Sequence, residues 1–414
     1  MKKIYFSFLF LLIVFSLSAQ QVKVLIDATK AEMAGNADWV IDADLFNLGV
    51  KTGGSMATGY GNEANPQRIP TPAQSGITAN TSETYWKGGL SAWGVELAKL
   101  GYIVESLPYN GLITYGNATN VQDLSNYKIF VICEPNILFT TAQKQAILNF
   151  VNNGGGLFMV ADHNVSDRNN DGWDSPHIFN DLMTNNGIVS NPFGISFDYQ
   201  NFSQTTLNYN SLPLDPVLHG PKGNPTRLKF SGGTSITLNT TANSSVKGLI
   251  YKTGSSFGNT NVLMAHSHYG NGKVVAIGDS SPCDDGTGDT NDGLYCGWSC
   301  EVGGDHARLF LNASIWLTTT TASPYKFSST STGSSTDFQF QIYPNPSSGV
   351  FNFRSNLPIS SLEVSDLSGR IIYSENSNEA TIEQADLSNC ENGIYIAVVK
   401  AGNEMMVKRI VISR

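Results

Sequence analysis

A polar run directly after an apolar segment holds the residues of this chain that are best suited to chemistry. The apolar segment, residues 156–161, is typical of a buried strand, and residues 162–174 then carry acidic, amide and imidazole side chains. Within the run, the spacing Asp167-x-Asn169-x-Asp171 followed by glycine matches the first half of a calcium loop. In such a loop, oxygens at alternate positions converge on a hard cation and glycine permits a sharp turn.

The second half of this motif departs from the pattern of an EF-hand. The twelfth position is Ile178, which cannot replace the bidentate glutamate of that loop. We therefore predict a Ca²⁺-binding loop carried by another fold, with the ligands Asp167, Asn169, Asp171 and Asp174. The alternative is a surface turn in which these side chains bond to the backbone without a metal.

Acidic residues recur just past the carboxyl ends of four predicted strands. They are Asp27, Glu134, Asp162 and Asp279. In open α/β sheets the ligand crevice lies outside these strand ends, at the topological switch point. Aspartate is also a common helix N-cap after a strand, which explains one or two of these positions better than all four. The pattern therefore predicts a polar, metal-containing site at this edge of the sheet.

A second acidic loop, residues 283–293, follows the last of these carboxylates. Its glycines permit tight turns, and its aspartates supply hard oxygen ligands. Among them we predict Asp285 and Asp289 as metal ligands. A flexible acidic loop without metal is the alternative.

Two histidines add candidates for acid–base catalysis. His163 adjoins Asp162 at a strand end, where a base or a metal ligand is useful. His306 lies at the start of a predicted helix, a position that depresses the pKa of an imidazole and can direct it into a crevice. The predicted catalytic residues are Glu134, Asp162, His163, Asp279 and His306.

Apolar strands alternate with amphipathic helices across residues 20–318, which are enough to bury one large core. The alternation predicts an α/β domain with a doubly wound, mostly parallel, flavodoxin-like sheet. The expected strands are 22–26, 102–107, 129–133, 157–160 and 273–277, and the expected helices are 88–100, one from Thr140 or Thr141 to Gly154, and 306–317.

The N-terminus predicts export. Two lysines precede a short apolar stretch that ends at Leu17, and Ser18-Ala19 offers a cleavage site. Residues 1–19 are therefore predicted to be a secretory signal peptide and not a membrane span. Removal of these two positive charges takes the formal net charge from −9 to −11. No basic stripe remains for nucleic acid, and no transmembrane segment is expected in the mature chain.

Five cysteines, an odd number, leave at least one unpaired within the chain. Cys133 ends an apolar strand and is expected to be a buried small hydrophobe. Cys283, Cys296 and Cys300 lie in one loop, so we expect a disulfide there, with the pairing open. A thiolate zinc site is the weaker alternative, because export favours oxidation.

A change of composition divides the chain. Residues 319–337 form a Ser/Thr-rich linker with little to bury. Residues 338–414 then contain Tyr-Pro-Asn-Pro at 343–346, Gly-Ile-Tyr at 393–395 and a clear strand at 394–399. On these motifs the segment resembles the C-terminal sorting domain of type IX secretion cargo from Bacteroidetes. The resemblance implies a small β-sandwich, the type IX secretion machinery as partner, and a secreted or cell-surface protein.

The preceding domain resembles the class I glutamine amidotransferase-like superfamily, nearest to its trehalose-utilisation-like and gliding-accessory-like branches. The resembling segments are 123–127, 150–157, 161–163 and 272–279. The resemblance implies the α/β fold with a β-rich insertion near 190–265. True amidotransferases of this superfamily carry a glycine-flanked nucleophilic cysteine and a later His-x-Glu. Here Cys133 lacks flanking glycines and Ala307-Arg308 follows His306, so the resemblance implies the fold and not amidotransferase chemistry.

These features lead to three functional hypotheses. The leading one is a secreted, Ca²⁺-binding hydrolase of extracellular carbohydrate, in which strand-end carboxylates act as general acid and base. The second is a metal-dependent phosphoesterase or nuclease, although no basic surface is expected to bind a phosphate polymer. The third is a non-catalytic, calcium-stabilised binding or adhesion module, because the chain has no Gly-x-Ser-x-Gly or His-Glu-x-x-His motif.

Overall fold

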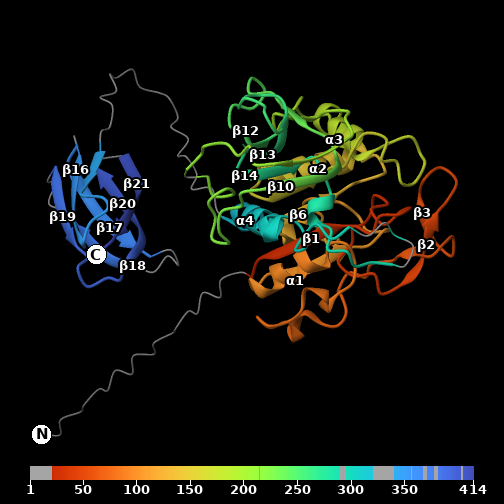
Figure 1. Cartoon of the computed structure of the whole chain (residues 1–414), viewed down its shortest axis with the longest axis horizontal. Coiled ribbons are helices and arrows are strands. Elements are labelled where there is room, and N and C mark those ends of the chain that lie inside the picture. Colours follow the sequence, from red (N-terminus) through yellow and green to blue (C-terminus); the bar gives the residue numbers. More distant parts are fainter. Residues whose placement is uncertain are drawn as a thin grey trace, which may run out of the picture. The chain divides into compact units, whose positions relative to one another are not determined.

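The computed structural model describes residues 21–319 without 214, 290, 291, 293 and 294, and residues 340–414 without 356, 367–370, 377–380, 402 and 403. The chain divides into two compact units near residue 326 (Figure 1). The predicted signal peptide, 1–19, and nearly all of the predicted linker, 319–337, lie outside the described residues. No helix in the described part combines the length and the apolarity that are needed to cross a membrane.

A nine-stranded sheet forms the centre of the first unit. Its parallel half has the order β5-β1-β6-β7-β14, and its antiparallel half continues with β13-β11-β8, while β12 also pairs with β13. The sheet confirms the predicted α/β class with a mostly parallel sheet. The bounds are β1 Lys23–Asp27, β5 Ile103–Leu107, β6 Ile129–Cys133, β7 Gly156–Val160, β8 Ile195–Phe197, β11 Ile236–Leu238, β12 Lys247–Tyr251, β13 Val262–Tyr269 and β14 Gly272–Ile277.

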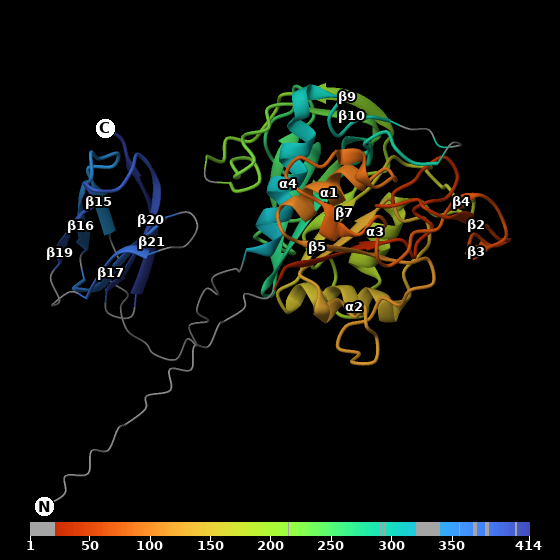
Figure 2. The same cartoon turned by 90° about the horizontal axis from the view of Figure 1, so that it is seen from below.

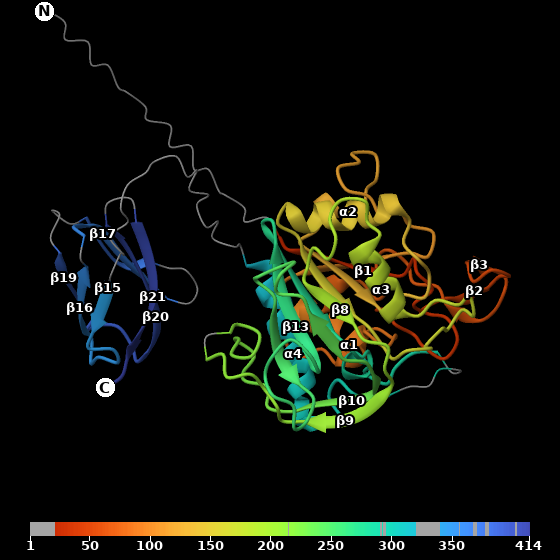
Figure 3. The same cartoon turned by 90° about the horizontal axis from the view of Figure 1, so that it is seen from above.

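Helices cover both faces of this sheet (Figures 2 and 3). Successive strand residues alternate between two cores, since side chains in a strand point to opposite faces. Val131 joins the core that contains Trp93 and Phe310, whereas Phe130 joins the core that contains Phe150. The helices are α1 Ser91–Lys99 and α4 Asp305–Thr318 on one face, and α2 Thr141–Asn152 and α3 Ser175–Thr184 on the other.

The first unit also contains two smaller sheets that are separate from the central sheet. One has the order β3-β2-β4, and the other pairs β9 with β10 inside the predicted insertion. The bounds are β2 Phe46–Val50, β3 Met56–Thr58, β4 Glu63–Ala64, β9 Phe202–Thr206 and β10 Leu228–Gly233. Short 3₁₀ helices connect these parts at η1 Gln74–Gly76, η2 Glu83–Tyr85, η3 Leu124–Asn126, η4 Ser281–Cys283 and η5 Val302–Gly304.

The second unit consists of two antiparallel sheets that share one core. Phe351 and Phe353 from one sheet pack with Val364 and Val399 from the other, as the prediction of a small β-sandwich requires. The sheets are β15-β16-β19 and β18-β17-β20-β21, with the bounds β15 Phe340–Tyr343, β16 Val350–Ser355, β17 Ile359–Ser365, β18 Ile371–Asn376, β19 Ile382–Asp386, β20 Gly393–Ala401 and β21 Glu404–Ile412.

Candidate functional site

A polar pocket of about 190 Å³ opens beyond the carboxyl ends of the parallel strands. Its lining comes from the segment after β1, the polar run after β7 and the loop after β14. This is the edge of the sheet that the sequence pattern predicted. Four carboxyl groups line the pocket, together with His163, Arg168 and three serines; they belong to Asp38, Asp162, Asp284 and Asp292.

Glu134 is fully buried behind the pocket lining, where it contacts the lining residues Arg168 and Ser280. Each carboxylate oxygen has two donors. Arg168 Nε at 2.7 Å and Ser166 Oγ donate to Oε1, and Ser280 Oγ at 3.2 Å and Trp39 Nε1 donate to Oε2. The backbone of Glu134 has φ +46°, a left-handed conformation that costs a residue other than glycine about 1–3 kcal/mol. This tight turn directs the side chain inward at the end of β6.

Asp162 lies beside Glu134, and Arg168 joins the two. Arg168 Nη2 donates to Asp162 Oδ2 at 2.9 Å, and the Ser166 hydroxyl lies 3.0 Å from the same oxygen. Because Ser166 has a single hydroxyl hydrogen and also contacts Glu134, a proton on Asp162 satisfies both contacts. Burial raises the pKa of Asp162 well above its usual value, and the neighbouring Glu134 adds to this effect.

His163 lines the same pocket. Its Nδ1 lies 2.7 Å from the backbone oxygen of Asn164 and 3.1 Å from Asn201 Nδ2. Nε2 lies 4.0 Å from Asp162 Oδ2. The structure therefore brings Glu134, Asp162 and His163 together, as the sequence predicted.

Asp279 lies just behind the pocket lining and is fully buried. It accepts hydrogen bonds from the backbone amides of Ser231 at 2.6 Å and Ser281 at 2.8 Å. Burial raises its pKa to about 7. The preceding Gly278 is required by a close approach, since a Cβ there would overlap the backbone oxygen of Thr234. Through its bond to Ser231, Asp279 connects the β-rich insertion to the end of β14.

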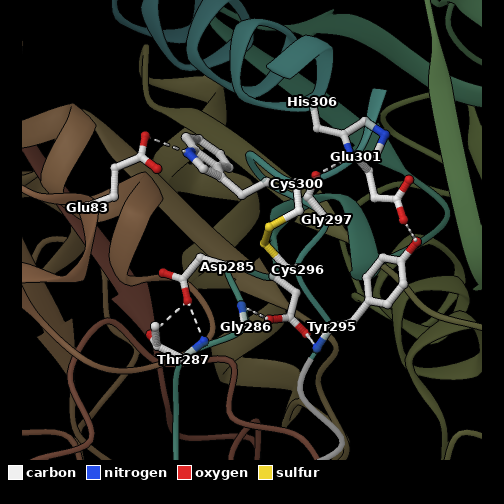
Figure 4. Close-up of a disulfide and its surroundings, with 12 residues drawn as sticks. Glu83, Asp285, Gly286, Thr287, Tyr295, Cys296, Gly297, Cys300, Glu301 and His306 are labelled. Carbon is white, nitrogen blue, oxygen red and sulfur yellow. Dashed lines mark hydrogen bonds between the residues drawn. A yellow bond between two sulfur atoms is a disulfide. The ribbon is translucent and has the colours of Figure 1, made fainter. Parts of the chain in front are cut away.

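His306 lies away from the residues that line the pocket. It is fully buried, and its Nδ1 lies 2.8 Å from the Gly297 oxygen (Figure 4), while its Nε2 accepts from the Lys229 amide at 2.9 Å. Burial lowers its pKa to about 4, which keeps the ring neutral. These contacts connect helix α4 to strand β10 and to the loop before η5 through backbone groups.

The predicted calcium loop is held largely by its own hydrogen bonds. Both carboxylate oxygens of Asp167 accept backbone amides, and Asp171 Oδ1 accepts the Trp173 amide at 3.0 Å. Asn169 donates to the Gly54 oxygen at 2.9 Å. Asp174 is the N-cap of α3 and accepts the His177 amide at 3.1 Å. The geometry includes the turn contacts of the metal-free alternative, and calcium binding here stays a prediction.

The second acidic loop separates into residues with different surroundings. Asp285 accepts the Ala92 amide and the Ser91 hydroxyl at the start of α1, and its other oxygen accepts from Thr287 (Figure 4). One oxygen of its carboxylate therefore caps helix α1. Asp284 faces the pocket instead, where burial raises its pKa to about 7.

Asp38 and Glu63 are site residues that the sequence analysis did not select. Asp38 is 4% exposed in the pocket wall, and burial followed by the charge of Asp292 raises its pKa well above its usual value. Burial also raises the pKa of Glu63 to about 7, with Asp289 as the next cause. Both come from the irregular segment between β1 and α1, where neither periodicity nor a motif marked them.

Two of the three cysteines between residues 283 and 300 pair with each other. Cys296 and Cys300 form a disulfide with a Cα–Cα distance of 5.5 Å (Figure 4). This confirms the expected disulfide and supplies its pairing. Cys283 instead lies beside Cys133, with the two sulfur atoms 3.9 Å apart, and both thiols are fully buried. Cys133 is thus the buried residue that the sequence predicted.

Comparison with known proteins identifies the C-terminal unit. Residues 341–413 match the family model of the secretion system C-terminal sorting domain. The protein is exported. Its location is therefore extracellular or on the cell surface, and the type IX secretion machinery is its partner in transport. No curated protein matches the chain.

Several solved structures share a weak likeness to the first unit, each covering 72% of this chain. The mmIFT52 N-terminal domain is 13% identical, with 97% of that chain covered and a TM-score of 0.41. A cytoplasmic protein of Salmonella typhimurium is 13% identical, with 98% covered and a TM-score of 0.37. A ThuA-like protein from Parabacteroides merdae is 14% identical, with 90% covered and a TM-score of 0.33. Likenesses at this level carry no conclusion about function.

Proposed function

We propose that this protein is an exported hydrolase that cleaves extracellular carbohydrate in the acid-lined pocket. The observation that carries the proposal is the pair of pocket carboxyls, Asp162 and Asp284, in which burial raises both pKa values. Hydrolysis of a glycosidic bond needs one carboxyl that holds a proton and one that accepts a proton from water. A single pocket with two such groups supports this chemistry.

The surroundings of the two carboxyls suggest a role for each. Asp162 lines the pocket and contacts Ser166 and Arg168, with Glu134 beside it. A protonated Asp162 is suited to donate to the leaving oxygen. Asp284, with a pKa of about 7, is half ionised near neutral pH and is suited to accept a proton from water. Glu134 positions Arg168 and Ser166 for this arrangement.

The lining of the pocket favours a neutral sugar over a phosphate. Arg168 is paired with Glu134 and Asp162, so its charge is already compensated. Carboxyl and hydroxyl groups suit the hydroxyls of a sugar, and Tyr295 adds an aromatic wall. We extend the proposal to Ca²⁺ as an organiser of the site, because the acidic lining of the pocket suits a hard cation.

The test is release of new reducing ends from a panel of neutral polysaccharides by the full chain at pH 6–7. Asp162→Asn and Asp284→Asn should each lower kcat by about 10²-fold or more, since each removes a proton-transfer group. The exposed Asp44→Asn is the matched control and should retain activity.

Other outcomes assign the alternatives. Cleavage of phosphoesters with Mg²⁺ or Mn²⁺, but not of polysaccharide, would replace this proposal with the phosphoesterase. Saturable binding of a polysaccharide without cleavage would replace it with the binding module. Equal activity in both variants and wild type would refute the assigned roles.

A further inference from the structure

A group of three carboxylates beside the pocket has the geometry of a cation site. Glu63, Asp289 and Asp292 each offer an oxygen, and these three atoms all lie within 4.8 Å of one another. Glu63 comes from β4, whereas the two aspartates come from the loop after β14. The group therefore joins two segments that lie far apart in sequence. It shares no residue with the calcium-like spacing at 167–171.

A neighbouring side chain, Asp38, points independently to a missing ligand. Asp38 is 4% exposed, and neither of its carboxylate oxygens has a hydrogen-bond partner of ordinary geometry among the described residues. The same is true of both oxygens of Asp292 within the described part of the chain. The backbone amide of Asp289 faces Asp38 and offsets the rise in its pKa only in part. Buried carboxylates without partners are costly unless a cation or a proton compensates them.

The nearby positive charge, the guanidinium of Arg168, is bonded to other groups. Arg168 lines the same pocket, but its guanidinium donates to Glu134, Asp162 and Asn36. Its charge lowers the pKa of Asp292, but by less than burial and the charge of Asp289 raise it. The group at Asp292 thus gathers acidic side chains whose charge this arginine leaves largely uncompensated.

We propose that Glu63, Asp289 and Asp292, with Asp38 behind them, bind a Ca²⁺ ion at the edge of the pocket. The ligand set consists of carboxylate oxygens, which suit a hard cation and not zinc or copper. Oxygens on opposite sides of Ca²⁺ lie up to about 5 Å apart, whereas those around Mg²⁺ reach only about 4 Å. The three oxygens lie within 4.8 Å of one another, separations that the ligands of a Ca²⁺ ion can have.

The ion would link the acidic loop to β4 and hold Asp292 at the pocket wall. Three or four carboxylates leave coordination positions of Ca²⁺ open, and sugar hydroxyls or water can fill them. Calcium binding at this site does not depend on hydrolase activity. Its failure and the failure of the proposed function are therefore separate results.

Calorimetric titration of the full chain with CaCl₂ after removal of metals by EDTA tests the site. We expect one ion per chain with a Kd of about 10⁻⁴ M, as in other extracellular calcium sites. Glu63→Gln and Asp292→Asn should each weaken binding about tenfold or more. The double variant Asp167→Asn/Asp171→Asn is the matched control and should bind as wild type does.

A second readout separates loss of ligand from loss of fold. In EDTA, Asp292→Asn should melt no lower than wild type, because it removes a charge that has no partner. The same variant should lose the increase in Tm that wild type gains from calcium. Loss of binding in the 167/171 control with retention in Asp292→Asn would overturn the proposal, as would no heat of binding to wild type or an equal preference for MgCl₂.

Discussion

Two walls of the same pocket differ in the hydrogen-bond donors that they offer to their carboxyl groups. At one wall, Glu134 has four donors and shares Arg168 with Asp162. At the other wall, Asp38 is buried and Asp292 is half-buried, and no side chain among the described residues donates to either carboxylate. The first wall is complete within the protein, whereas the second requires a proton or a cation from solution. A buried carboxylate can therefore be a structural anchor or a ligand, and its donors decide which.

The largest expected effect comes from breaking the complete wall. Arg168→Met leaves Glu134 and Asp162 buried without their cation, and removal of one partner from a buried ion pair costs about 3–5 kcal/mol. Urea unfolding should show this loss in the free energy of unfolding, with a smaller loss for Arg168→Lys. A change below about 1 kcal/mol would mean that the serines and the indole suffice without the arginine.

The pH dependence of stability reports on two pocket carboxyls with raised pKa values, Asp292 and Asp284, of which Asp284 accepts backbone amides from Gly286 and Tyr295. Burial raises the pKa of Asp284 to about 7 and of Asp292 to about 6, while the unfolded values lie near 3.8. The folded chain thus holds protons that the unfolded chain has released, and stability falls as the pH rises from about 4 to about 7. In EDTA, Tm should be about 5 °C lower at pH 8 than at pH 5.

Calcium should remove most of this difference in Tm. The ion stabilises the ionised carboxylates, so the added stability appears at pH 8 and fades towards pH 5. Parallel melting curves with CaCl₂ and with EDTA measure it. A calcium effect of equal size at both pH values would show that the ion does not act through these carboxylates.

A smaller gain in stability should follow from Asp38→Asn. The change replaces a buried charge without partners by a neutral group of the same shape, which should stabilise the calcium-free protein by about 1 kcal/mol at pH 8. Urea unfolding in EDTA measures the change. Destabilisation by a similar amount would indicate that the carboxylate has a partner in solution that the described contacts omit.

The smallest effect sharpens the contrast inside one loop. Asp285 lies next to Asp284 in sequence, yet one of its oxygens caps helix α1 and the other accepts from Thr287. Asp285→Ala should lower the free energy of unfolding by about 1 kcal/mol, as loss of a helix cap does. Its calcium affinity should match that of wild type. A tenfold weaker affinity would instead support its prediction as a metal ligand.

The sequence predicted the parallel sheet and the place of the site for clear physical reasons. Apolar runs that end in Asp27, Glu134 or Asp279 carry both the strand and its polar end in a few adjacent letters. The capping box of α2, with Thr140 and Gln143, is equally local. Local patterns of this kind are readable without an alignment.

The rest of the site depends on contacts between distant segments. Asp38 and Asp292 meet from opposite ends of the domain sequence, and no spacing rule connects them. Arg168 was inside the predicted run, but only the fold shows that it joins Glu134 to Asp162. His306 lies in the first turn of α4, as the sequence predicted. Its contacts with the backbone of Lys229 and Gly297 depend on the fold, and no local pattern marks them.

The most direct test of the contrast between the two walls is a crystal structure of the full chain grown with CaCl₂, with anomalous scattering used to locate the ion. We predict one peak within about 2.6 Å of oxygens from Glu63, Asp289 and Asp292, and no change around Glu134. A peak among residues 167–171 alone, or no peak beside Asp292, would contradict the account.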